Sequence, residues 1–274
     1  MMRFSLAQMA EFTGGRVIGA NVEVDGMIHD ARRAEPGNLF CALPGERHDG
    51  HEFLEQARDN GAAAALVERE TGDALPQLVV GNVREAMGRI ARAWRDRLDV
   101  AVVGITGSNG KTTVKEMTAA ILAAQGPTLA TEGNYNNEIG VPLTLARLDP
   151  SHRFAVIEMG CNRPGDIAYL TSIARPDVGV VTNAGPAHLE LLGSVEGVAR
   201  TKGEMFQALP SDGTAVINAD DDYAPLWREM AGQRRIISFG IGGAANVSGV
   251  LAGGLGLVNT PSGDFRFAPA LPGR

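Results

Sequence analysis

The spacing of apolar and polar residues along the chain changes character near residue 98. Before that point, short helical and strand-like patterns alternate without a regular order. Helices are predicted over residues 5–12, 51–60 and 83–98, and strands over residues 22–28, 38–43, 62–67 and 77–80. The helix at 5–12 has a capping serine, Ser5, and ends before Gly14. This pattern predicts a small mixed α/β domain over residues 1–98.

From residue 99 onward, strands and helices follow one another in regular alternation. Strands are predicted over residues 100–105, 154–159, 178–182, 214–218 and 235–239, and helices over residues 112–124, 165–174, 194–209 and 221–230. Such alternation is typical of a mostly parallel sheet with helices on both faces. Parallel sheets of this kind bind ligands at the carboxyl ends of their strands. We therefore expect a second domain over residues 99–274, with its site at that edge.

A glycine-rich loop joins the first of these strands to the first helix. Residues 104–113 read Gly-Ile-Thr-Gly-Ser-Asn-Gly-Lys-Thr-Thr, in which the glycines allow the backbone N–H groups to surround one anion. Lys111 can reach terminal phosphates, and Thr112 offers a hydroxyl to magnesium. Ile105 departs from the common phosphate-loop pattern, and the alternative is an ordinary turn before a helix. We predict that a nucleoside triphosphate binds Gly107, Ser108, Asn109, Gly110, Lys111, Thr112 and Thr113.

Composition and charge narrow the class of partner. The 274 residues are 44% hydrophobic and 21% charged, with a net charge of −7, so no basic face for nucleic acid is expected. Only two cysteines occur, which excludes a disulfide framework and favours the reducing cytoplasm. No stretch approaches the roughly 20 apolar residues of a membrane span. We expect a cytoplasmic monomer that acts on small molecules, without a membrane span.

Several stretches, taken in order, resemble the Mur ligase family, the ATP-dependent amide ligases that build peptidoglycan precursors for the cell wall. They are the glycine loop and residues 134–142, 155–160, 182–190 and 199–206. Residues 30–42 and 45–53 resemble the uridine-nucleotide domain of the same family. The resemblance implies a UDP-sugar-binding domain over residues 1–98, followed by a central ATPase domain of the phosphate-loop type.

The resemblance also implies a reaction and its cofactors. The family member that the stretches fit best joins D-alanyl-D-alanine to UDP-N-acetylmuramoyl-tripeptide through an acyl phosphate, using ATP and two magnesium ions. In that member an adenine-contacting helix and a third, C-terminal domain would follow, and this sequence shows neither. We therefore expect these 274 residues alone not to complete the amide bond.

Three further residues receive roles through the resemblance. Glu158 would be a magnesium ligand, and His188 would help to hold the second metal ion. Lys202, which begins Lys-Gly-Glu-Met-Phe, would be carbamylated and would bind magnesium through the carbamate. With Lys111 they form the predicted catalytic set, and with Thr112 the metal set. The residues alone leave alternatives without a functional role open: a water-facing glutamate, an incidental loop histidine and an exposed helix lysine.

The predicted substrate contacts also rest on the resemblance. Asn134, Asn136 and Asn137 would line the site, although asparagines are equally typical of a turn. Arg32 and Asp49 would contact the uridine nucleotide. Arg32 follows Asp30-Ala31, where the family usually has Asp-Ser-Arg, so one expected hydroxyl is missing. The alternative for Arg32 is a surface arginine.

Other functions are compatible with parts of the pattern. Within ligases, the alternatives are the family member that adds the third residue and folylpolyglutamate synthetase, which residues 182–190 and 202–206 disfavour. A phosphate-loop kinase or hydrolase would release ADP without any amine substrate. A non-catalytic nucleotide-binding fragment would show no turnover at all.

Overall fold

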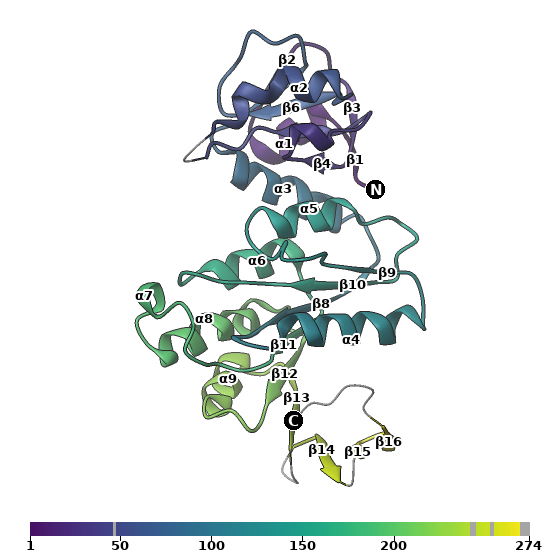
Figure 1. Ribbon diagram of the computed structural model, residues 1–274, viewed down its shortest axis with the longest axis vertical. Helices are drawn as coiled ribbons and strands as arrows, with labels where there is room; N and C mark the ends of the chain where they lie inside the picture. Colours follow the sequence, from purple (N-terminus) through teal and green to yellow (C-terminus); the bar gives the residue numbers. More distant parts are fainter. Residues whose placement is uncertain (46–47, 242–244, 253–254, 269–274) are drawn as a thin grey trace. The chain divides into compact units, whose positions relative to one another are not determined.

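The computed structural model describes residues 1–45, 48–241, 245–252 and 255–268. The chain forms two compact units that interleave along the sequence (Figure 1). The first comprises Met1–Ala101, Thr118–Ile157 and Ser172–Arg175; the second comprises Val102–Met117, Glu158–Thr171 and Pro176–Arg274. A single boundary near residue 98 therefore does not describe the compact units. The ligand-binding roles of the two predicted domains stay predictions.

The first unit contains a five-stranded sheet in the order β2-β7-β6-β5-β4. Its strands are β2 (Arg16–Ile18), β4 (Met27–Ile28), β5 (Leu39–Cys41), β6 (Ala64–Val67) and β7 (Gln77–Val79). β4 to β7 are parallel, and β2 is antiparallel to β7. All residues of β5 and β6 are buried, as expected for parallel strands covered on both faces. A separate pair joins β1 (Arg3–Ser5) and β3 (Glu23–Asp25).

Helices cover this sheet where the apolar spacing predicts them. They are α1 (Leu6–Thr13), α2 (Leu54–Asp59) and α3 (Val83–Arg95), with short 3-10 turns at Ala31–Arg33 and Gly50–Phe53. The predicted cap of α1 is confirmed, because the Ser5 hydroxyl accepts from the N–H of Gln8 and Gly14 ends the helix at φ 71°. Leu54 and Ala57 of α2 pack on Phe40 and Ala65 of the sheet. The helix α5 (Gly140–Ala146) packs against α3.

The second unit confirms the predicted parallel sheet. Its strands β8 (Ala101–Thr106), β11 (Val178–Val181), β12 (Thr214–Asn218) and β13 (Arg235–Ile241) lie side by side in that order, all parallel. The strands β9 (Thr128–Ala130) and β10 (Phe154–Glu158), which belong to the first unit except for Glu158, form a further parallel pair. Because the paired strands are parallel, their carboxyl ends meet at one edge of the sheet, and the polar residues that follow the strands gather there.

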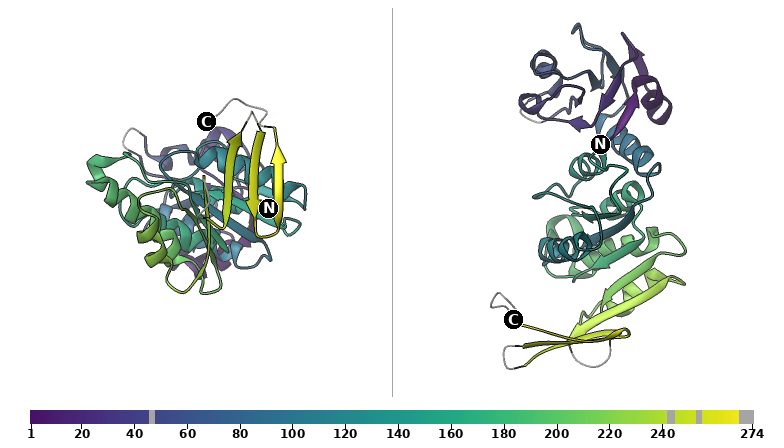
Figure 2. Two further views of the ribbon diagram at one scale, coloured as in Figure 1. Left: turned by 90° about the horizontal axis from the view of Figure 1, so that it is seen from below. Right: turned by 90° about the vertical axis from the view of Figure 1, so that its right-hand side faces the viewer.

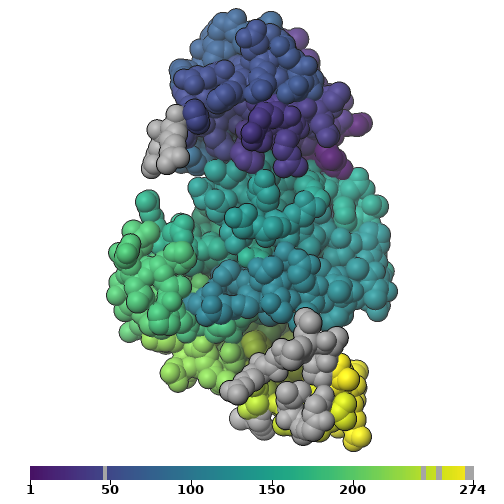
Figure 3. Space-filling model, viewed as in Figure 1, coloured from purple at the N-terminus to yellow at the C-terminus, as the bar shows by residue number. Residues whose placement is uncertain are grey.

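The last strands of the second unit turn antiparallel. β14 (Val247–Ala252) continues parallel to β13, and β15 (Leu255–Thr260) and β16 (Gly263–Phe267) then pair antiparallel, as Figure 2 shows. In Figure 3 these strands lie at the surface in yellow, and Phe265 and Phe267 are exposed. The part of the predicted second domain that falls on residues 242–244, 253–254 and 269–274 lies outside the described residues.

Two helices of the second unit form its core with the sheet. The helices of this part of the chain are α4 (Lys111–Ala123), α6 (Asp166–Ala174), α7 (Leu189–Leu192), α8 (Val195–Ala208) and α9 (Ala224–Ala231). Phe206 of α8 and Trp227 of α9 are fully buried against Val181 and Ile217. The indole N–H of Trp227 donates to the carbonyl of Ala199 at 2.9 Å. None of the helices in the described ranges has the length and apolar character needed to cross a bilayer.

We predict that Trp227→Ala lowers the free energy of unfolding by about 3–5 kcal/mol, because it leaves a cavity in this core. Arg228→Ala, the adjacent exposed position on α9, should change stability by less than about 0.5 kcal/mol. Urea unfolding of both variants measures the difference. Equal stability of the two variants would contradict this account of the core.

Candidate nucleotide and metal site

The glycine loop curls between β8 and α4 in a shape that its glycines alone permit. Gly107 has φ 153° and Gly110 has φ 78°, both unfavourable for residues with a side chain. A Cβ atom on Gly107 would also lie 1.8 Å from the hydroxyl oxygen of Thr182. The first N–H groups of α4 have no partner within the helix, so they are available to an anion. The loop therefore has the form that phosphate binding requires.

Two of the predicted nucleotide-binding residues are held by the loop that follows β11. The Ser108 hydroxyl accepts from the N–H of Gly185 at 2.9 Å and donates to its carbonyl at 3.1 Å. The N–H of Asn109 donates to the side-chain oxygen of Asn183 at 2.9 Å. These contacts fix the shape of the loop, and direct contact of Ser108 and Asn109 with a nucleotide stays a prediction.

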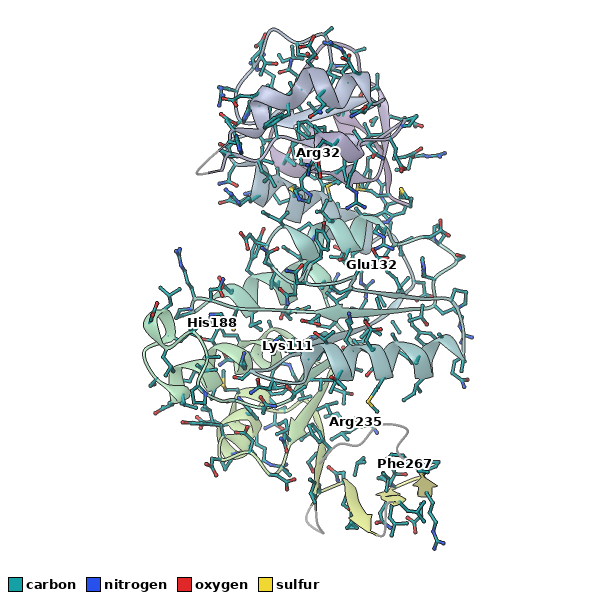
Figure 4. The ribbon with its side chains drawn as sticks, in the orientation of Figure 1. Arg32, Lys111, Glu132, His188, Arg235 and Phe267 are labelled. Atoms are coloured by element: carbon teal, nitrogen blue, oxygen red, sulfur yellow. The ribbon has the colours of Figure 1, made fainter. Side chains whose placement is uncertain are left out.

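Lys111 lies folded over its own loop (Figure 4). Its ammonium group donates to the carbonyl of Gly107 at 2.8 Å and reaches the carbonyl of Ser108 at 3.4 Å. The lysine is half-buried and stands at the first position of α4. Bound phosphates would offer the ammonium stronger, charged acceptors, so we expect it to exchange these carbonyls for phosphate oxygens.

Thr112 and Glu158 provide adjacent oxygen atoms. The Thr112 hydroxyl donates to the Glu158 carboxylate at 3.0 Å, and Glu158 is only 2% exposed at the end of β10. The alternative of a water-facing glutamate is therefore wrong. Hydroxyl and carboxylate oxygens are the donors that Mg²⁺ prefers, so this pair fits the predicted metal. Lys115, a turn further along α4 and 1% exposed, is a buried cation that the sequence pattern did not single out.

Lys202 is buried, so the alternative of an exposed helix lysine is also wrong. It lies on α8, is 3% exposed, and its amine stands 3.6 Å from the Cys161 sulfur. Burial lowers the pKa of Lys202; the neighbouring Cys161 opposes this shift, and the positive charge of Lys111 adds to it. A lowered pKa favours the neutral amine, which is the form that reacts with carbon dioxide.

His188 occupies a different setting. It stands at the start of α7 with φ 51°, and it is exposed on the loop labelled in Figure 4. Across the described ranges, no three or more His, Cys, Asp and Glu side chains are grouped so as to hold a metal ion. A metal set formed by Thr112, Glu158, His188 and Lys202 therefore stays a prediction.

The asparagine loop before α5 is a compact turn in the first unit. The Asn137 side-chain oxygen accepts from the N–H groups of Ile139 at 3.2 Å and Gly140 at 2.9 Å. The N–H of Asn136 donates to the carbonyl of Asn134 at 2.8 Å. These contacts match the turn alternative, and contact of the three asparagines with substrate stays a prediction. A pocket of about 180 Å³ nearby is lined by Met27, Ile28, His29, Arg33, Glu132, Tyr135, Leu143, Thr144 and Arg147.

Arg32 and Asp49 both make internal ion pairs. The Arg32 guanidinium bonds to Asp30 at 2.8 Å and its side chain is 76% exposed (Figure 4). Asp49 accepts from the backbone N–H of His51 at 3.0 Å, contacts the His51 ring at 2.6 Å and pairs with Arg69 at 2.6 Å. These bonds hold the pKa of the Asp49 carboxyl well below its usual range. Asp49 thus stabilises its own loop, and a nucleotide contact by either residue stays a prediction.

Comparison with known families assigns the class of the protein. Residues 105–274 match the Mur ligase middle domain, and residues 23–95 match the Mur ligase family catalytic domain. These matches cover most of the sequence and include the glycine loop, Glu158, His188 and Lys202. The chain belongs to the Mur ligase family.

Individual members of the family are similar to the chain over most or all of its length. The chain is 43% identical over 280 residues to the UDP-N-acetylmuramoyl-tripeptide--D-alanyl-D-alanine ligase of Escherichia coli K12, a match that spans 100% of this chain and 62% of that protein. The structure of MurF from Acinetobacter baumannii has a TM-score of 0.89 at 35% identity, covering 97% of this chain and 60% of that one. A MurF ligase from Thermotoga maritima in complex with ADP has a TM-score of 0.79 at 32% identity, over 89% and 57% of the two chains. The chain thus spans between about half and three-fifths of the length of the relatives it matches.

We predict that Gly107→Ala weakens MgATP binding at least about tenfold, because its methyl group collides with Thr182. Gly232→Ala is the matched control: Gly232 has φ 62° but no atom within 4 Å of its Cβ position. Both variants carry backbone strain, and only the first should lose nucleotide affinity in a calorimetric titration. Equal affinities for the two variants would show that the close contact is unimportant.

We also predict a pH-dependent effect of Asp49→Asn. The folded-state pKa of Asp49 lies below that of an unfolded aspartate, about 3.9. Its stabilising contribution is therefore present above that pH and is lost as the pH falls towards the folded-state pKa. The urea midpoint of the variant should lie below wild type at pH 7, and the difference should shrink steadily as the pH falls below about 4. A difference that stays constant with pH would contradict the assignment.

Proposed function

We propose that the chain carries the nucleotide- and substrate-binding parts of an ATP-dependent ligase that joins D-alanyl-D-alanine to UDP-N-acetylmuramoyl-tripeptide. The observation that carries the proposal is the curled glycine loop with Lys111 over it and the Thr112–Glu158 oxygen pair, 3.0 Å apart, beside it. The activity of the Escherichia coli relative, UDP-N-acetylmuramoyl-tripeptide--D-alanyl-D-alanine ligase, supplies the substrates. The protein would work as a monomer in the cytoplasm.

The reaction consists of two transfers. The γ-phosphoryl group of ATP passes to the terminal carboxylate of the tripeptide, giving ADP and an acyl phosphate. The amine of D-alanyl-D-alanine then attacks the acyl carbon, the C–O bond to phosphate breaks, and the amine loses a proton to solvent. Lys111 and the N–H groups at the start of α4 would bind and orient the phosphates throughout, so the chain contributes positioning and charge stabilisation.

Magnesium would be held by Thr112 and Glu158, with His188 and a carbamylated Lys202 completing the set for two ions. When bound, it neutralises negative charge on the phosphoryl group that is transferred. The neutral amine of Lys202 would add to carbon dioxide with release of one proton. A lysine ammonium group would repel a metal ion. The carbamate formed from the amine is an anion, and its two oxygens can bind magnesium.

The remaining residues of the site would bind the nucleotide sugar. Arg32 and Asp49 lie in the part of the chain that matches the family over residues 23–95. In this proposal they contact the uridine nucleotide, and Asn134, Asn136 and Asn137 line the path of the peptide.

A kinase or hydrolase is the main alternative from another class, and an isotope label separates it from the ligase. Tripeptide substrate carrying ¹⁸O in its terminal carboxylate is incubated with the chain, MgATP and D-alanyl-D-alanine. Attack on the acyl carbon leaves one ¹⁸O atom in the released phosphate. Phosphate released at the same rate without tripeptide, and without the label, would identify a hydrolase instead. Mass spectrometry of the same mixture tests our expectation that these 274 residues alone do not form the amide.

We predict that Lys202→Ala lowers tripeptide-dependent phosphate release by about a hundredfold or more. A short-chain carboxylate should restore part of this activity. Arg200→Ala, on the same helix with its side chain 60% exposed, is the control that should retain activity. Incubation with ¹³C-bicarbonate should give a carbamate NMR signal in wild type that Lys202→Ala lacks. Wild-type activity in Lys202→Ala would refute the role.

A further inference from the structure

The end of β11 makes a close set of hydrogen bonds to the glycine loop, and the proposed chemistry does not use them. The side chain of Asn183 binds both backbone groups of one loop residue: its oxygen accepts from the N–H of Asn109 at 2.9 Å, and its amide donates to the Asn109 carbonyl at 3.1 Å. The Thr182 hydroxyl donates to the same carbonyl at 2.7 Å. The N–H of Ser108 donates to the backbone carbonyl of Asn183 at 3.0 Å.

These bonds decide which backbone groups of the loop can face an anion. The N–H of Asn109 points to Asn183, so it is already satisfied and is not directed at the phosphate position. The N–H groups of Lys111, Thr112 and Thr113 open helix α4 and have no helical acceptor. The N–H groups in the first turn of α4 therefore remain open to an anion, whereas the N–H groups of Ser108 and Asn109 are already bonded to Asn183.

The residues that hold the loop are themselves fixed. The Asn218 amide, at the end of β12, donates to the Thr182 carbonyl at 2.9 Å. The Asp221 carboxylate accepts from the N–H of Ala184 at 2.8 Å. Thr182 is 6% exposed. The end of β11 is anchored on both sides of Asn183. The Asn183 side chain therefore has a fixed position and can determine the conformation of the glycine loop.

We propose that Asn183, assisted by the Thr182 hydroxyl, is a positioning residue that sets the glycine loop in its anion-binding shape before the nucleotide arrives. The inference rests on the proposed function and adds a residue to it. The amide is suited to this task because it has one donor and one acceptor, which match the two backbone groups of Asn109. Aspartate lacks the donor and leucine lacks both, so neither can replace it.

The test uses four variants of the whole chain. Asn183→Leu keeps the approximate size and removes both polar groups, and Thr182→Val removes the hydroxyl. Thr182→Ser keeps the hydroxyl and is the conservative variant. Arg234→Ala is the stability control, because Arg234 donates to the carbonyls of Gln207 at 2.8 Å and Leu209 at 2.7 Å, outside the contacts with the glycine loop.

Two readouts are measured on each variant: amide hydrogen exchange of the Asn109 region without nucleotide, and the Kd for MgATP. For Asn183→Leu we expect exchange at least about tenfold faster and a Kd about 10- to 100-fold weaker, since two hydrogen bonds are lost. Thr182→Val should show a smaller loss, and Thr182→Ser should stay near wild type. Arg234→Ala should lose thermal stability while both readouts stay unchanged.

Unchanged exchange in Asn183→Leu would overturn the proposal, because the loop would then keep its shape without the side chain. Faster exchange with a Kd within about twofold of wild type would overturn it as well, because the shape would not matter for binding. If wild type itself fails to bind MgATP, the proposed function is contradicted, and the exchange measurement still decides whether Asn183 holds the loop.

Discussion

The contact between Gly107 and Thr182 is the constraint on which the site depends. It brings the loop after β8 against the end of β11, so that a side chain at position 107 has no room: a Cβ there would lie 1.8 Å from the Thr182 hydroxyl oxygen. Parallel pairing of β8 with β11 sets this approach, since Thr106 stands opposite Val181. The polar groups at the end of β11 can then bind the loop, and the open N–H groups of α4 are left for an anion. The anion site thus follows from strand register.

Burial of charge is the second feature that shapes the site. Glu158 is 2% exposed and Lys202 is 3% exposed, although charged side chains are rarely buried without a partner. The Thr112 hydroxyl satisfies part of the Glu158 carboxylate, and the pKa of Lys202 is lowered by its burial. A carbamate would relieve the cost of burying the Lys202 ammonium group, which gives a physical reason for the proposed chemistry to lie here.

Much of the fold could be predicted from the sequence, because most elements have a clear apolar period. The strand over Thr214–Asn218 agrees with the prediction residue by residue, and Ser5 caps α1 as predicted. Helix α5 was missed because all seven of its residues, Gly140–Ala146, are buried, so no polar face marks a helical period. The three-residue strands β1, β2 and β9 and the four-residue helix α7 were also missed.

Only part of the candidate site could be predicted from the sequence. The glycine loop was found because its residues are consecutive, and the family membership follows from motifs in a fixed order. The burial of Lys202 could have been predicted from helical spacing, because Lys202 lies four residues from both Val198 and Phe206, on the buried face of α8. The expectation of an exposed lysine followed the residue type instead of this spacing. The hold of Asn183 on Asn109 joins positions 74 residues apart, and it depends on a strand register that periodicity does not specify.

The most direct test of the account is a crystal structure of the chain with bound MgADP, compared with the nucleotide-free form. The account predicts that the backbone of residues 106–112 is the same in both, with Asn109 still bonded to Asn183. Only the Lys111 ammonium should move, from the Gly107 carbonyl to a phosphate oxygen. A loop that opens, with the N–H of Asn109 turned away from Asn183 and onto the phosphate, would contradict a preformed site.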